Sequence, residues 1–94
     1  MIRVGVLKID FHVSGSESLK EKRFALRRIK DRVKSRFNVS IAEIDNHDKW
    51  QAATLGASCV SNDKKHIDSV LNKVKNFIER DKDIVIVDYQ IEII

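Results

Sequence analysis

The sequence predicts an α+β domain in which two helices pack on one face of a four-stranded antiparallel sheet. Three observations support this prediction. Apolar and polar residues alternate near both ends of the chain, two internal segments repeat apolar residues at helical spacing, and the segments follow the order βαββαβ. The 94 residues, 43% of them hydrophobic, are enough for one core but too few for two. We therefore expect a single domain over residues 1–94.

The first strand is expected at residues 2–13, where apolar residues occupy every second position from Leu7 to Val13. Ile2, Val4 and Val6 add apolar groups to the second face of this strand. Part of that face should therefore be covered, either by the chain itself or by another subunit.

The first helix is expected to begin at Ser18, which forms a capping-box pattern with Glu21, and to end at Asn38 in a left-handed cap. Its buried stripe is formed by Leu19, Leu26, Ile29, Val33 and Phe37. Lys22 falls about 30° from the centre of this stripe at the angular step of an α-helix. Phe24 falls nearly opposite the stripe and is expected to be exposed.

The remaining elements are two strands at residues 39–45 and 50–61, a helix at 63–80 capped by Asn62, and a last strand at 84–94. A polar turn at residues 46–49 joins the two middle strands. In the last strand, Val85, Val87, Tyr89, Ile91 and Ile93 alternate with polar residues. Ile84 and Ile86 are then expected on the second face of the sheet.

Two right-handed crossovers give these elements the strand order 4-1-3-2, which is the ferredoxin-like fold. This topology brings four segments to one edge of the sheet: the end of the first strand, the start of the first helix, the turn between the middle strands and the entry to the last strand. The fold hosts many unrelated functions, so it does not itself indicate one.

Half of the cationic side chains lie in the first helix. Residues 18–36 hold nine of the eighteen Lys and Arg residues and only two acidic ones. Such a concentration attracts phosphate backbones, and RNA is the first partner to consider; a solvated helix face is the alternative. The phosphate-binding residues that we expect are Lys20, Lys22, Arg23, Arg27, Arg28 and Arg32, with Trp50 and Gln51 at the adjoining edge.

Two of these residues have alternative interpretations. Lys22 either pairs with Asp48 or a backbone carbonyl and pins the turn to the helix, or joins Lys20 and Arg23 in a phosphate site. Trp50 either packs in the core or hairpin, or offers a ring to a base.

Five stretches of the chain together resemble the YlxP-like bacterial family, a family of unknown function. They are SLKEKR, RFNVSIAE, the turn D-x-W-Q from Asp48 to Gln51, LGASCVSND and DYQIE. The resemblance spans nearly the whole chain and implies a ferredoxin-like fold in the bacterial cytoplasm. From the family's usual setting among translation genes, it also implies an association with RNA or ribosomal particles. It supplies no catalytic residues.

Other chemistries have weaker support in the sequence. No nucleotide-binding loop, nucleophile elbow or metal-ligand spacing is present, so we expect no catalysis, metal or cofactor. A small enzyme using His12, His47 and Asp48 is the catalytic alternative. The single cysteine, Cys59, is expected in the core.

A protein-interaction or small-ligand module is the other alternative. A homodimer could form through the sheet face around Val4, Val6, Ile84 and Ile86. Charges at Arg3, Lys8 and Asp10 interrupt the first apolar segment, so no signal peptide or membrane span is expected and the protein should be cytoplasmic.

Overall fold

The computed structural model describes residues 1–94 and has six elements in the predicted order βαββαβ. They are β1 (Arg3–Val13), α1 (Leu19–Arg36), β2 (Ser40–Asp45), β3 (Ala52–Ser61), α2 (Lys64–Glu79) and β4 (Ile84–Ile93). The strands form one antiparallel sheet in the order β2-β3-β1-β4. The ferredoxin-like α+β fold with strand order 4-1-3-2 is therefore confirmed.

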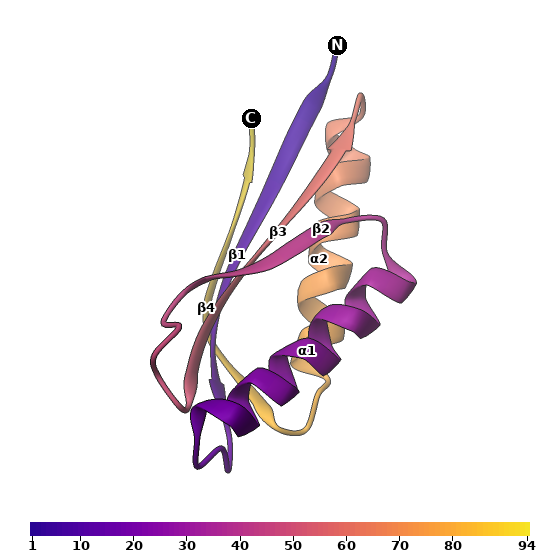
Figure 1. The fold of residues 1–94 in the computed structure, drawn as a ribbon. Coiled ribbons are helices and arrows are strands. Elements are labelled where there is room, and N and C mark those ends of the chain that lie inside the picture. The colour runs from indigo at the N-terminus through magenta and orange to yellow at the C-terminus, as the bar shows by residue number, and fades with distance from the viewer.

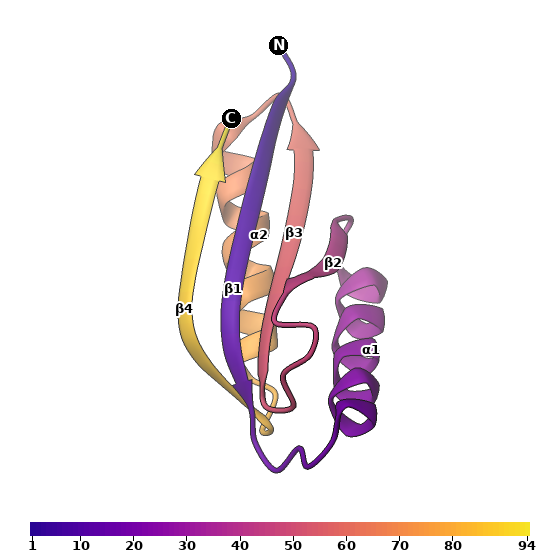
Figure 2. The ribbon, with the colours of Figure 1, turned by 60° about the vertical axis from the view of Figure 1, so that its left-hand side comes forward.

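The two helices cover different parts of the sheet (Figures 1 and 2). α2 lies along β1, β3 and β4, whereas α1 packs mainly against β2 and alongside α2. Eighteen buried apolar residues from all six elements form one continuous core, which includes Cys59 as predicted. Neither helix combines the length and the apolar character that a membrane crossing requires.

The N-terminus of α1 follows the prediction, but two other helix ends differ. Ser18 accepts a hydrogen bond from the backbone N–H of Glu21 (3.1 Å). Asn38 does not form a left-handed cap. α1 ends at Arg36, and the residue that caps it is Phe37, which has an extended backbone and a ring 5.8 Å from that of Phe77 on α2. α2 is capped by the carboxylate of Asp63, which accepts a hydrogen bond from the Lys65 N–H, and not by Asn62.

A β-bulge in β4 reverses which of its residues face the core. Asp88 pairs with Asp10 and Ile86 pairs with Phe11, so Val87 has no partner on β1. Ile84 and Ile86 consequently point inward, and Ile84 is buried. The expectation that these two isoleucines lie on the second face was wrong, because the extra residue shifts the alternation by one position.

Candidate functional site

Lys22 lies inside the protein and cannot contact a ligand at the surface. Its side chain has no exposed area, and its ammonium donates hydrogen bonds to the carbonyl oxygens of Asn46 (2.7 Å) and Ala52 (3.1 Å). The ammonium also lies 3.1 Å from a carboxylate oxygen of Glu43 on β2. Of the two interpretations of this lysine, the one in which it binds backbone carbonyls and pins the turn is correct, and Lys22 does not belong to a phosphate site.

The turn between β2 and β3 is held by polar contacts. Asn46 adopts a left-handed backbone conformation (φ 61°), and its amide donates a hydrogen bond to Thr54 Oγ1 (2.9 Å). The Thr54 hydroxyl donates in turn to Asp10 (2.6 Å). Gln51 donates to the carbonyl of Ser16 (2.9 Å), which ties the turn to the loop before α1. The amide of Gln51 therefore has a structural contact.

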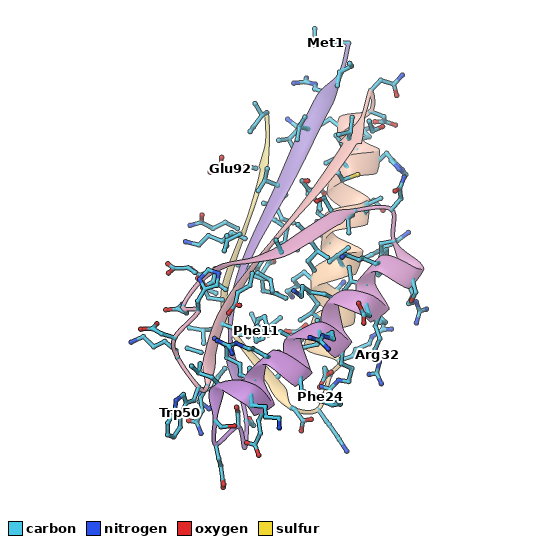
Figure 3. All side chains as sticks on the ribbon, viewed as in Figure 1. Met1, Phe11, Phe24, Arg32, Trp50 and Glu92 are labelled. Carbon is cyan, nitrogen blue, oxygen red and sulfur yellow. The ribbon has the colours of Figure 1, made fainter.

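Trp50 lies outside β3, which begins two residues later at Ala52. The expected strand at residues 50–61 was therefore too long at its start. Trp50 is 56% exposed, so the interpretation of this residue as part of the core was also wrong. Figure 3 shows its side chain near the N-terminal end of α1.

The outer face of α1 carries three of the predicted cations around one aromatic ring. Lys20, Arg23 and Arg27 surround Phe24, and together with Glu21 they line an open hollow of about 560 Å³. Phe24 is 71% exposed, as its position opposite the buried stripe predicted. This face therefore presents both positive charge and one accessible π-surface.

A second basic surface lies between the two helices, and we call it the interhelical groove. Arg28, Arg32 and Arg36 follow one another at four-residue spacing along α1, so they lie on the flank that faces α2. The residues that continue the groove on α2 and beyond it are Lys73, Asn76, Phe77, Arg80, Asp81, Lys82 and Asp83. Three adjoining hollows share Arg80, so the groove is continuous.

Ion pairs and a stacking contact order part of this groove. Arg28 lies 2.8 Å from Asp81 and 3.8 Å from Asp83, while its Nε atom is buried without a hydrogen-bond partner. The guanidinium of Arg36 lies over the ring of Phe77, 5.0 Å from its centroid. Arg32 and Arg80 are exposed and take part in no ion pair. They are the two arginines of the groove that neither form an ion pair nor stack on a ring, and Lys73 and Lys82 are likewise exposed and outside any ion pair.

The sequence identified only part of this groove. Arg28 and Arg32 were predicted, but Arg36, Lys73, Arg80 and Lys82 were not. The four-residue repeat of arginines along the first helix was a signal for the α1 flank. The contribution of α2 depends on how the helices pack, and the mixed charges of the second helix gave no sign of it.

The residues of the catalytic alternative come from two separate segments of the chain. His12 lies on β1, whereas His47 and Asp48 lie in the turn, and all three are exposed. No hydrogen bond or ion pair joins any two of them. No group of three His, Cys, Asp or Glu residues is arranged to hold a metal ion.

Comparisons with known proteins agree with the resemblance noted in the sequence. A family described as "Protein of unknown function (DUF503)" matches residues 4–91. The "Uncharacterized protein YlxP" of Bacillus subtilis (strain 168) is 38% identical over 76 residues, which cover 81% of this chain and 83% of the relative. Among solved structures, the "De novo designed protein Foldit4" is similar, with a TM-score of 0.54 and 17% identity over 97% of this chain and 96% of that chain. This last likeness concerns the fold alone.

Proposed function

The chain belongs to the DUF503 family of proteins of unknown function, and for this member we propose a non-catalytic role as an RNA- or ribosome-associated protein of the bacterial cytoplasm. Its binding surface is the interhelical groove together with the outer face of α1. The phosphate backbone of the RNA is the group that this surface contacts.

The observation that carries this proposal is the convergence of cations from two helices on one groove. Six cationic side chains line the groove, against two carboxylates, of which Asp81 lines two of the three hollows and Asp83 lines one. They are Arg28, Arg32, Arg36, Lys73, Arg80 and Lys82. Like charges gathered in this way repel one another, and a polyanion relieves that repulsion while releasing its own counterions.

The spacing of the arginines suits a linear polyanion. Residues four apart on an α-helix are separated by about 6 Å along its axis, so Arg28, Arg32 and Arg36 leave the helix at regular intervals along one flank. Successive phosphates of a nucleic-acid strand present charges at a comparable interval. Guanidinium groups bind phosphate oxygens through two parallel hydrogen bonds, as they also bind carboxylates, so the regular spacing of the arginines is the feature that favours a phosphate backbone over scattered acidic side chains.

The experiment compares two double variants that change the net charge equally. Arg32→Gln/Arg80→Gln removes the two free guanidinium groups of the groove, and Lys64→Gln/Lys65→Gln removes two exposed lysines at the start of α2. Binding to a fluorescein-labelled RNA and co-sedimentation with ribosomal particles are measured for both. The first variant should lose affinity on the order of tenfold, and the second should lose much less. An equal loss of RNA affinity in the two variants would show that only the net charge matters and would contradict the proposal that the groove binds RNA.

A second candidate, self-association through the sheet, is favoured by a row of apolar residues on its open face. Val4 pairs with Val60 on β3 and exchanges two backbone hydrogen bonds with Ile94, so the three side chains lie side by side. Val60 is 67% exposed and Ile94 is 72% exposed. The same row on a second copy of the chain is the partner that we propose. This contact uses the sheet face and is compatible with RNA binding at the helices.

A further inference from the structure

Phe24 is an exposed aromatic residue that does not belong to the hydrophobic core. It projects from α1 on the side away from β2, as does Arg32 (Figure 3). Its ring is 71% exposed, and it is the one apolar residue among the five that line its hollow. Removing the ring would therefore leave the packing of the protein unchanged.

The charges around Phe24 indicate what its ring could contact. Lys20, Arg23 and Arg27 lie around it, and Glu21 is the one acidic residue of the hollow. A ring face and adjacent cations offer contacts to the two parts of a nucleotide, the base and the phosphate. A single ring among charged groups is a small apolar area for a protein interface, whose centre is depleted of charged residues.

Phe24 also lies at one end of the interhelical groove. A shallow hollow lined by Phe24, Arg28 and Asp83 joins the outer face of α1 to the groove, because Arg28 and Asp83 line both. From Phe24 to Arg36, this path runs about 18 Å along the helix axis. A strand whose phosphates follow the arginines would bring a base within reach of the ring.

We propose that Phe24 is a stacking platform for an unpaired base of single-stranded RNA, with Arg23 and Arg27 contacting the neighbouring phosphates. The inference rests on the proposed function and deepens it, since it names the form of RNA that the surface takes. A base within a duplex is already stacked on both faces and cannot lie on the ring. The site therefore prefers single strands to duplexes.

The test is fluorescence anisotropy with three labelled probes of equal length: a single-stranded oligoadenylate, the same backbone with abasic positions, and an RNA duplex. Phe24→Ala should weaken binding of the oligoadenylate by about 5- to 100-fold and leave binding of the abasic and duplex probes unchanged. Phe24→Trp should retain binding, because it keeps an aromatic face. Phe24→Leu, which keeps an apolar group without a π-face, should behave as the alanine variant does.

Two controls make the result interpretable. Val85→Ala truncates another exposed apolar side chain, on β4 and outside both proposed surfaces, and should bind like the unaltered protein. The midpoint of thermal unfolding should not fall in any Phe24 variant, since the ring is exposed and Ala and Leu favour a helix at least as well as Phe does. A lowered midpoint in the alanine variant would show that the ring is part of the fold and would contradict the proposal.

The outcomes separate this inference from the function on which it rests. If Phe24→Ala binds all three probes as the unaltered protein does, while Arg32→Gln/Arg80→Gln weakens binding, stacking is wrong and the phosphate-binding groove stands. That outcome would assign the ring to a protein partner. An equal loss for duplex and single strand would also contradict stacking. If the unaltered protein binds none of the probes, both proposals fail.

Discussion

The ammonium of Lys22 lies 3.1 Å from the carboxylate of Glu43, and this ion pair joins α1 to β2 inside the protein. The same ammonium holds the carbonyls of Asn46 and Ala52, so one side chain connects the helix, the strand and the turn. Lys22→Met keeps the apolar part of the side chain but leaves the Glu43 charge without its partner. We expect a loss of about 3 kcal/mol in the free energy of unfolding, measured by urea denaturation.

The double variant Lys22→Met/Glu43→Leu is the control for this prediction. Removing both charges leaves no unpaired carboxylate, so it should recover a large part of the lost stability. Once folded, both variants should bind RNA like the unaltered protein, because Lys22 is buried away from the surface. A loss of RNA affinity at unchanged stability would contradict the structural role of Lys22.

The bulge at Val87 predicts that two single-residue deletions in β4 lower the free energy of unfolding by different amounts. Deleting Val87 places Ile86 directly before Asp88 and keeps both residues in their observed pairs with β1. We expect this deletion to cost about 1 kcal/mol or less. Deleting Gln90 instead turns Ile91 and Ile93 to the other face, with an expected cost of about 3 kcal/mol. Thermal unfolding of the two variants measures this difference, and an equal loss of stability in both would argue against the bulge.

Local rules allowed much of the fold to be predicted from the sequence. The capping pattern at Ser18 and the helical spacing of apolar residues placed both ends of α1 within two residues of the observed ones. The angular step of an α-helix placed Lys22 near the core and Phe24 on the opposite side of the helix, and both positions are confirmed. These features depend on residues close together in the sequence.

The features that were missed depend on contacts between distant segments. The bulge at Val87 arises from pairing with β1, and nothing within the apolar run from Ile84 to Val87 marks it. The interhelical groove depends on the placement of Arg80 beside Arg32, which follows from the packing of α1 against α2. For the same reason, the sequence could not show that Asp81 would be the partner of Arg28.

Asp83 reduces the positive charge at one end of the groove, so neutralising it should strengthen RNA binding. Its carboxylate lies 3.8 Å from Arg28 and is partly exposed. Asp83→Asn should raise the affinity for single-stranded RNA by about two- to threefold, as expected for one exposed charge. Asp68→Asn, which changes an exposed acid of α2, is the matched control and should have a smaller effect. Weaker binding by Asp83→Asn would contradict the placement of the RNA along Arg28.

Sedimentation over a hundredfold range of concentration tests self-association through the row formed by Val4, Val60 and Ile94. We expect the unaltered protein to form a dimer. Val60→Glu should raise the dissociation constant by on the order of tenfold or more, because a two-fold contact would bring two carboxylates together. A protein that stays monomeric over the whole range would rule out this second candidate.

The salt dependence of RNA binding tests the central claim most directly. Each phosphate contact that a protein makes contributes roughly 0.7 to 0.9 to the slope of log affinity against log salt concentration. The unaltered protein should therefore show a steep slope, and Arg32→Gln/Arg80→Gln should reduce it by about 1.5, while Lys64→Gln/Lys65→Gln leaves it nearly unchanged. Binding that is independent of salt, or a slope that the groove variant does not alter, would contradict the account that the groove between α1 and α2 binds the phosphate backbone of RNA.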